Sequence, residues 1–421
     1  MEPNDKINLI SFSETRGGAA KATRSLYNAL LNHGVNVHLI VAEAKSEGSI
    51  AVSPGKLQSF MHFLLRLIAF ALGKALRYKG ASKLSFNFFS SSFVVKKIFE
   101  RNYIHINWVN NETVSLDNLA KICESKKVII TLHDEWLYNG IEHCSDDIFN
   151  SNPEFERVNH SWLYKVVNNV VFNKKKSIAP FLKNAIYTVP SRWMLNRARN
   201  SEILNGCDIR LIPNIIDTRV FRKKQSAYND VIKGWRENGN FIILFGAINV
   251  ESNMLKGGAL LYDALKRLDL YLENNAMKKI KLVTFGGTRR GQVTINGFEV
   301  FNVGHVTSSE DMATLYSSCS ITAVPSLTES FGQVAAESLA CETPVLCFEC
   351  TGLKDIVSHR VNGYLAKSYS SDELSKGIVW LANMHKDELE NYGRRGRASM
   401  KKNFSAEVVT GEYIKLYSEF I

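Results

Sequence analysis

Short apolar runs of strand length alternate with helical segments along the chain, in two successive series. The first series comprises residues 8–12, 36–43, 103–110, 127–133 and 185–191, and the second comprises residues 241–247, 279–287, 320–326 and 343–348. These runs are almost continuously apolar, as is typical of parallel strands that helices cover on both faces. Two such series predict an α/β protein with two doubly wound, Rossmann-like domains.

The joint between the domains is expected just after residues 210–217 (RLIPNIID), where a polar, irregular stretch begins. A chain of 421 residues is long enough for two domains of about 200 residues each. We therefore predict an N-terminal domain over residues 1–217 and a C-terminal domain over residues 218–403.

The chain is basic, with a formal net charge of +11. Such an excess attracts phosphate in nucleic acids, anionic membranes or phosphorylated substrates. The basic residues are dispersed without an aromatic-plus-basic motif, so nucleic acid is not an expected partner. Seven scattered cysteines predict free thiols in a reducing compartment. Cys347 and Cys350 form a CxxC, but no second pair completes a metal site.

The N-terminal segment MEPNDKINLISFSE contains acidic residues and lacks the apolar core of a signal peptide, so a cytoplasmic location is expected. Residues 56–80 combine apolar bulk with basic side chains. The apolar part, residues 60–72, is shorter than the roughly 20 residues of a spanning helix. Two interpretations stay open for this segment: a helix that rests on anionic lipid, or a helix packed in the core.

The strongest motif lies in residues 320–340, SITAVPSLTESFGQVAAESLA. A strand leads into a loop with Glu329, and the following helix contains Glu337. The free amides of Phe331, Gly332 and Gln333 at the helix start favour a diphosphate. Carboxylates accept hydrogen bonds from hydroxyls, as sugar and ribose recognition requires. A nucleotide-sugar is a ligand that offers both groups.

Two further segments place cations or glycines at strand ends. Lys256 precedes Gly257 and Gly258 at a helix start, where an ammonium group could neutralise a departing diphosphate. The turn Arg16-Gly17-Gly18 follows the first strand, and its glycines let a ligand approach the backbone. This turn fits neither GxGxxG nor GxxxxGK[ST], so it does not indicate a dinucleotide site or a P-loop.

His133 and Asp134 lie where another apolar strand meets a loop. A histidine can donate to a substrate hydroxyl, and an adjacent carboxylate can orient it or contact an acceptor. For His105 and Asn107, in HINW, lining a site and packing in the core are both open.

The segment around Glu329 and Glu337 resembles the E-x7-E motif of family 4 glycosyltransferases, which have the GT-B fold. The wider segment VPSLTESFGQVAAESLACETPVL is similar to the branch of bacterial exopolysaccharide and O-antigen enzymes that includes the colanic-acid glycosyltransferases. Agreement recurs at HINW, TLHDEW, VPSRWM, IPNIID and FSAEVVTGEYIKLY. The resemblance implies two domains facing across a cleft, with a last helix at about residues 404–421 packed back on the N-terminal domain.

The resemblance also implies a retaining glycosyltransferase that uses a nucleotide-diphosphate-sugar. Glu337 would hold the ribose, Glu329 the donor sugar, and His133 would act against that sugar. The implied catalytic residues are His133, Glu329 and Lys256. The implied donor-binding residues are Gly17, Gly18, Lys256, Glu329, Ser330, Phe331, Gly332, Gln333 and Glu337, with Arg16, Asp134, Arg289 and Arg290 as further candidates.

This sequence departs from the family pattern at one cation. Many relatives pair the lysine with an arginine, but Ala247 and Leu255 occupy those places here, so Arg289 and Arg290 are candidates to replace it. No metal or other cofactor is expected. The expected acceptor is a lipid-diphosphate-linked saccharide, reached by peripheral contact with the cytoplasmic face of the inner membrane. The alternatives are a nucleotide-sugar epimerase or phosphorylase of the same fold, and a non-catalytic sugar- or lipid-binding scaffold.

Overall fold

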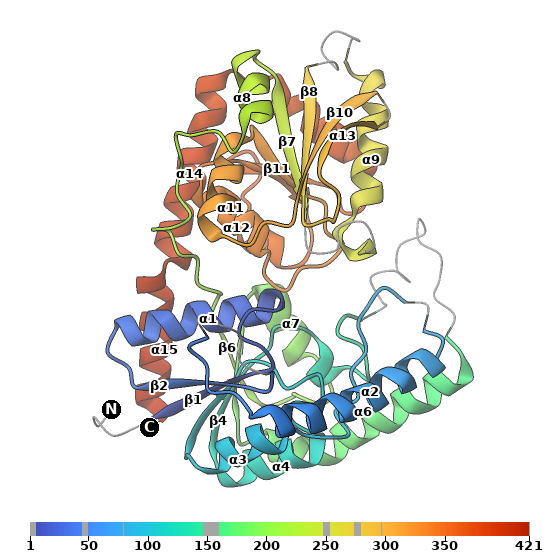
Figure 1. The fold of residues 1–421 in the computed structure, drawn as a ribbon, viewed down its shortest axis with the longest axis vertical. Coiled ribbons are helices and arrows are strands. Elements are labelled where there is room, and N and C mark those ends of the chain that lie inside the picture. Colours follow the sequence, from blue (N-terminus) through green and yellow to red (C-terminus); the bar gives the residue numbers. More distant parts are fainter. Residues whose placement is uncertain are drawn as a thin grey trace. The chain divides into compact units, whose positions relative to one another are not determined.

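The protein forms two compact units (Figure 1). The computed structural model describes residues 6–43, 49–78, 80–145, 160–246, 253–272, 279–295 and 297–420. Unit 1 comprises Met1–Ile215 with Val409–Ile421, and unit 2 comprises Ile216–Val408. The sequence placed the boundary after Asp217 and the returning helix at about residues 404–421, within a few residues of these divisions.

Unit 1 contains a six-stranded parallel sheet in the order β2-β1-β3-β4-β5-β6. The strands are β1 (Ile7–Ser11), β2 (Val37–Val41), β3 (Tyr103–Ile106), β4 (Lys127–Thr131), β5 (Ile186–Val189) and β6 (Asp208–Leu211). The first five are the predicted strands. The sixth was not predicted, because its DIRL sequence is short and half polar.

The helices of unit 1 begin mostly at serines. They are α1 (Gly17–Asn32), α2 (Lys56–Ala75), α3 (Ser92–Phe99), α4 (Leu116–Ser125), α6 (Trp162–Leu182), α7 (Arg192–Arg199) and α15 (Ala406–Phe420), with a 3₁₀ turn η1 (Trp136–Tyr138). Ser91, Ser115, Ser161 and Ser191 each accept a hydrogen bond from the amide three residues on. Such caps satisfy one of the free amides at a helix start.

The two faces of the unit 1 sheet bury different side chains because strand residues alternate in direction. Ile10, Ile106 and Ile130 belong to the main apolar core, which also contains residues of α3, α4 and α6. On the other face, His105 is fully buried against Tyr413 and Tyr417 of α15. The last helix of the chain therefore completes the first unit.

Unit 2 contains a seven-stranded sheet in the order β13-β12-β11-β7-β8-β10-β9, with β9 antiparallel to β10. The strands are β7 (Phe241–Gly246), β8 (Ile280–Phe285), β9 (Gly291–Ile295), β10 (Phe298–Gly304), β11 (Ile321–Val324), β12 (Val345–Phe348) and β13 (Gly363–Ala366). The strands β7, β8, β11 and β12 are the four that the sequence predicted.

The helical elements of unit 2 connect these strands and pack on the sheet. They are α8 (Asp230–Glu237), α9 (Gly258–Lys266), α11 (Ser309–Ser318), α12 (Gln333–Ala340), α13 (Ser371–Ala382) and α14 (Lys386–Phe404), with the 3₁₀ turns η2 (Met254–Lys256), η3 (Arg267–Leu270) and η4 (Thr351–Asp355). Both units are Rossmann-like α/β domains, as predicted.

Each sheet has a point where the strand order reverses. In unit 2 this point lies between β7 and β11, and in unit 1 between β1 and β3. Ligands of open α/β sheets bind beyond the carboxyl ends of the strands at such points. The segments that carry Lys256 and Glu329 follow β7 and β11, and the Gly17 turn follows β1.

Four expectations from the sequence can be compared with the structure. All seven cysteines are free, as predicted. Among the described helices, none has the length and apolar character needed to cross a membrane. Within the described residues, no three His, Cys, Asp or Glu side chains gather as they would around a metal ion. Of the two interpretations of residues 56–80, core packing holds for one side of α2 only: His62 is buried and Ala69 and Leu72 pack on the core, but eight large apolar side chains of the helix are exposed.

Candidate functional site

Lys256 and Glu329 form an ion pair in unit 2. The Lys256 Nζ lies 2.6 Å from Glu329 Oε1, and both side chains are partly exposed, at 25% and 18%. Ser326 Oγ donates to the same carboxylate oxygen at 2.9 Å. The two segments that the sequence singled out separately thus meet at the carboxyl ends of neighbouring strands.

Backbone contacts hold both partners of this ion pair. Gly257, next to Lys256, has a φ of +66°, and a Cβ there would lie 1.8 Å from the carbonyl oxygen of Pro325. The amide of Leu327 donates to Leu255 O at 2.8 Å. Glycine at 257 is therefore required both by the left-handed backbone and by the close approach of the β11 loop.

The Glu329 backbone is fixed by the η4 segment. Its amide donates to Thr351 Oγ1 at 3.0 Å, and its carbonyl accepts from the amide of Gly352 at 2.9 Å. A Cβ at Gly352 would lie 2.7 Å from the carbonyl oxygen of Ser330. The loop that carries Glu329 and Ser330 is accordingly held in one place.

Glu337, eight residues further on, is buried in α12. Its Oε2 accepts from Tyr316 Oη at 3.0 Å, and its Oε1 accepts from Gln333 Nε2 at 3.2 Å. Burial, together with the neighbouring carboxylate, raises the pKa of Tyr316 well above its ordinary value. Tyr316 therefore keeps its proton and orients the carboxylate of Glu337.

The start of α12 has backbone amides that are available to bind an anion. Within the described residues, the amides of Phe331, Gly332 and Gln333 have no recorded acceptor. Gly332 has a φ of +107°, and a Cβ there would lie 2.8 Å from Leu353 Cδ2. The Phe331 ring is buried against Phe404, with ring centroids 5.5 Å apart. This packing holds the backbone in place and leaves the three N–H groups available to an anion.

The candidates for a second cation lie between β8 and β9. Arg289 and Arg290 are both exposed there. Leu255 lies in η2, and Ala247 lies outside the described residues. The role of either arginine stays a prediction.

In unit 1, the turn after β1 is open above its glycines. A Cβ at Gly17 or Gly18 would meet no described atom within 4 Å. Ser13 Oγ accepts from the Arg16 amide at 3.2 Å, and the Arg16 side chain pairs with Glu43 at 3.0 Å. The glycines are therefore not required by local crowding, which leaves room for a ligand.

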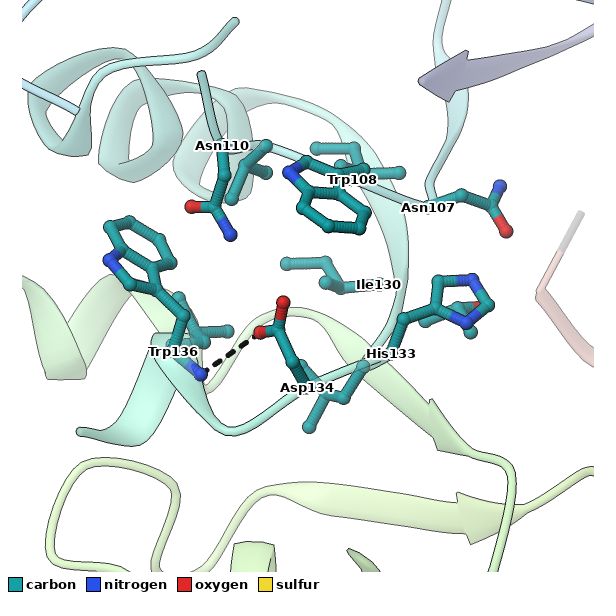
Figure 2. A pocket seen from close by; sticks show the side chains of 12 residues that line it. Asn107, Trp108, Asn110, Ile130, His133, Asp134 and Trp136 are labelled. Carbon is teal, nitrogen blue, oxygen red and sulfur yellow. Dashed lines mark hydrogen bonds between the residues drawn. The ribbon is translucent and has the colours of Figure 1, made fainter. Parts of the chain in front are cut away.

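His133 borders a small cavity of about 30 Å³ at the carboxyl ends of β3 and β4 (Figure 2). Four polar atoms of its lining are buried without a hydrogen-bond partner among the described residues: Asn107 Nδ2, Trp108 Nε1, Asn110 Oδ1 and His133 Nε2. Buried polar atoms are nearly always paired, so this cavity offers hydrogen bonds to a water molecule or a hydroxyl group.

Burial lowers the pKa of His133 to about 4, although the neighbouring charge of Asp134 acts in the opposite direction. The imidazole is therefore neutral near pH 7 and can donate or accept through Nε2.

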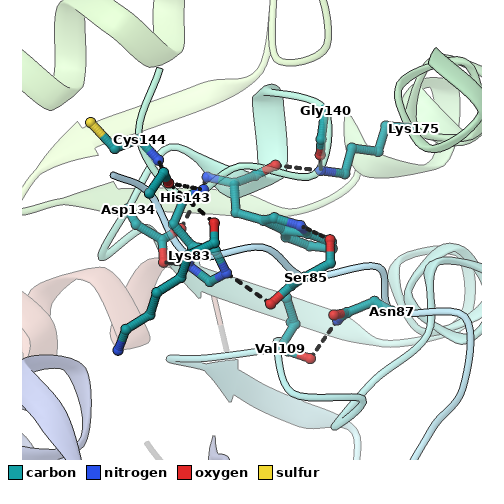
Figure 3. Close-up of polar contacts among 11 residues, drawn as sticks. Lys83, Ser85, Asn87, Val109, Asp134, Gly140, His143, Cys144 and Lys175 are labelled. Carbon is teal, nitrogen blue, oxygen red and sulfur yellow. Dashed lines mark hydrogen bonds and ion pairs between the residues drawn. The ribbon is translucent and has the colours of Figure 1, made fainter. Parts of the chain in front are cut away.

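The Asp134 carboxylate contacts His143 and the Trp136 amide, and none of its hydrogen bonds recorded within the described residues goes to His133 (Figure 3). Its Oδ2 lies 2.7 Å from His143 Nδ1, and its Oδ1 accepts from the amide of Trp136 at 3.0 Å. His143 Nε2 lies in turn 2.8 Å from Ser85 Oγ. Burial alone would raise the pKa of Asp134, but His143 and the Trp136 amide lower it overall.

His105 belongs to the core rather than to the site. Its Nδ1 lies 2.7 Å from Tyr417 Oη, and its Nε2 lies 2.7 Å from Thr131 Oγ1. Burial lowers its pKa to about 3. Of the two HINW residues left open by the sequence, only Asn107 lines the cavity.

Several residues of these sites were missed from the sequence. Trp108 and Asn110 follow β3 directly, so the rule that ligands bind at strand ends could have found them. His143, Ser85 and Tyr316 gave no signal, because their roles depend on contacts between distant segments. Lys175 also gave none: it is fully buried, and its Nζ donates to the carbonyls of Trp136, Asn139 and Gly140 (Figure 3).

Comparison with known proteins relates unit 2 to one family. Residues 232–399 match the model of the family described as "Glycosyl transferases group 1". This segment is therefore similar to glycosyltransferase group 1 domains. It contains Lys256, Glu329 and Glu337.

A longer match extends beyond this domain. An uncharacterized glycosyltransferase of Methanocaldococcus jannaschii is 30% identical over 252 residues, which are 58% of this chain and 66% of that protein. The chain thus spans just under two thirds of the length of this curated relative.

Solved structures share the whole fold. HepE of Anabaena, in complex with UDP and glucose, has a TM-score of 0.61 at 15% identity, over 99% of this chain and 100% of that chain. Sucrose-phosphate synthase of Thermosynechococcus elongatus has a TM-score of 0.66 at 17% identity, over 99% of each chain. The fold is therefore GT-B, as the sequence analysis predicted.

Proposed function

We propose that this protein is a retaining, metal-independent glycosyltransferase that moves a sugar from a nucleotide-diphosphate-sugar to a lipid-diphosphate-linked saccharide in bacterial surface polysaccharide synthesis. The observation that carries the proposal is the ion pair of Lys256 and Glu329 beside the start of α12. A cation, a carboxylate and free backbone amides at one sheet switch point suit the diphosphate and the hydroxyls of one donor.

In this proposal the donor contacts unit 2 through three groups. The amides of Phe331, Gly332 and Gln333 bind the diphosphate, Glu337 binds the ribose hydroxyls, and Glu329 binds hydroxyls of the sugar. Two observations support the roles of the glutamates. Tyr316 and Gln333 orient Glu337, and the η4 segment fixes Glu329. HepE, which shares the fold, binds UDP and glucose.

For the transfer step, we propose that the bond from the anomeric carbon to the diphosphate breaks as the acceptor oxygen bonds on the same face of the sugar. The acceptor proton passes to the departing diphosphate, so the product keeps the donor configuration. Lys256 stabilises the negative charge on the leaving group. Neutral His133 steadies a hydroxyl of the donor sugar, and the unpaired atoms beside it support a polar contact there.

The proposal is tested with purified protein and a panel of nucleotide-sugars. Thermal shift identifies the donor, and release of nucleotide is then measured with and without a lipid-linked saccharide. Transfer predicts release that depends on the acceptor. Release without acceptor would instead favour a donor hydrolase or another reaction on the same fold, and binding without any release would favour a scaffold.

The retaining outcome and the residue roles need separate measurements. The anomeric configuration of the product is read by NMR, and an inverted product would contradict the retaining mechanism. His133→Ala is expected to reduce kcat more than donor affinity. Chelator treatment of the purified protein is expected to leave its turnover unchanged, and a loss restored by a divalent cation would refute metal independence.

A further inference from the structure

Helix α2 exposes its apolar side chains. The outer face of α2 consists of eight large apolar residues whose exposed fractions run from 39% to 75%: Leu57, Phe60, Met61, Phe63, Leu64, Leu67, Ile68 and Phe70. Scattered single apolar residues are normal on a surface, but a contiguous patch of this kind indicates a binding surface. Figure 1 shows α2 along the outside of unit 1.

The inner face of the same helix carries polar groups. His62 Nε2 lies 2.9 Å from Glu112 O, and the Arg66 guanidinium lies 4.5 Å from the centroid of the Phe12 ring. Ala69 and Leu72 pack on the core beside them. The polarity of α2 is thus the reverse of an ordinary surface helix, which turns its apolar stripe inward. Packing among the described residues of unit 1 does not account for the outer face.

The charged residues of the segment that contains α2 are all basic. The chain has no acidic residue between Glu47 and Glu100. Lys56 and Lys74 are exposed near the two ends of α2, and Arg77 is exposed just beyond it. Exposed cations beside an apolar face are typical of helices that bind anionic lipid.

Trp162 extends this surface at the start of α6. Its side chain is 74% exposed. The preceding residue, Ser161, donates from its Oγ to the carbonyl of Leu76 at 2.9 Å, which joins the start of α6 to the end of α2. Tryptophan is favoured where an apolar phase meets water.

We propose that the outer face of α2, together with Trp162, docks this protein on an anionic lipid bilayer, with the helix lying in the interface. A second copy of the chain fits less well, because a symmetric contact would bring Lys56, Lys74 and Arg77 against the same cations. The docking proposal depends only on the surface features of α2 and Trp162. Only its use, to reach a lipid-linked acceptor, rests on the proposed function.

The test is co-sedimentation of the full chain with vesicles of mixed phosphatidylglycerol and phosphatidylcholine, and with vesicles of phosphatidylcholine alone. The wild type is expected to bind the anionic vesicles more tightly. Phe60→Gln combined with Ile68→Gln is expected to weaken that binding about tenfold or more, since both changes remove exposed apolar area. Leu270→Gln in unit 2, where Leu270 is 68% exposed, is the matched control and should bind as the wild type does.

A charge variant separates the two contributions. Lys56→Glu combined with Lys74→Glu should lose the preference for anionic vesicles. The proposal is overturned if the wild type does not bind vesicles, or if the Phe60 and Ile68 variant binds as tightly. It is also overturned if the wild type is a dimer that the same variant converts to a monomer without changing vesicle binding. Donor affinity, measured without lipid, should be equal in all variants, so a failed docking test leaves the proposed function standing.

Discussion

The ammonium group of Lys256 lies 2.6 Å from the Glu329 carboxylate, across 73 positions of sequence. Without a donor bound, each charge therefore neutralises the other. A diphosphate that takes Lys256 as its partner would free Glu329 to accept hydrogen bonds from sugar hydroxyls. In the proposed donor complex, the pair would link recognition of the diphosphate to recognition of the sugar.

Lys256→Met should reduce kcat/KM about 100-fold or more, because a preorganised cation at the leaving group is lost. The measurement is steady-state nucleotide release with the donor found by thermal shift. Lys266→Met, at the exposed end of α9, changes the same charge in the same domain and should keep full activity. Full activity of the Lys256 variant would remove this residue from the mechanism.

Glu337→Ala should weaken donor binding about tenfold to 100-fold, since hydrogen bonds to a charged group are lost. Tyr316→Phe should have a smaller effect in the same direction, because it removes only the bond that orients Glu337. Isothermal titration with the nucleotide diphosphate measures both. If Tyr316→Phe weakened binding more than Glu337→Ala, Glu337 could not be the residue that contacts the ribose directly.

The pH dependence of the free energy of unfolding should reflect the protonation of His133. Burial lowers its pKa from 6.5 to about 4, so between these values the unfolded chain binds more protons than the folded one. The free energy of unfolding should therefore fall as the pH falls from about 7 to about 5. His133→Gln should show a shallower fall in urea unfolding. His105, with a pKa of about 3, contributes in the same direction and remains in the variant.

His143→Ala should destabilise unit 1 by about 1–3 kcal/mol, because Asp134 and Ser85 both lose their partner. Ser85→Ala should cost less, about 1 kcal/mol, since the bond between Asp134 and His143 stays. Urea unfolding measures both variants. His305→Ala, at an exposed position, is the control, and an equal loss there would show that the hydrogen-bonded chain has no special role.

Lys175→Met should destabilise the chain by about 3 kcal/mol, because three buried carbonyls lose their donor. Burial lowers the pKa of this lysine well below its ordinary value. The neighbouring Lys176, whose Nζ lies 2.5 Å from Glu202 Oε1 at the surface, gives a matched control. Lys176→Met should change stability by less than about 1 kcal/mol.

The sequence predicted the strands and the paired motifs because these features are local. Continuous apolar runs mark β7 and β11, and the segment after each run contains one member of the pair, Lys256 or Glu329. Parallel strands of one sheet end at one edge, so the two motifs had to approach each other. The strands β9, β10 and β13 were missed because β9 (GQVTI) and β10 (FEVFNVG) contain polar residues and β13 (GYLA) is only four residues long.

Side-chain partners could not be predicted in the same way. His105 was left open between site and core, and Tyr417, 312 residues away, decides it for the core. Asp134 was expected to orient His133 or contact an acceptor, but His143 from the following loop takes its carboxylate. For α2, composition gave the basic and apolar content, and only packing shows which face is turned outward.

The contact of Tyr417 with His105 has a consequence for synthesis. All residues of unit 2 are synthesised before Val409–Ile421, the last part of unit 1. Because domains generally fold as units during translation, the part of the N-terminal sheet around His105 stays uncovered until α15 is synthesised. A chain that lacks the final turn of α15 would contain all residues of unit 2. Its unit 1 would lack the contact between Tyr417 and His105.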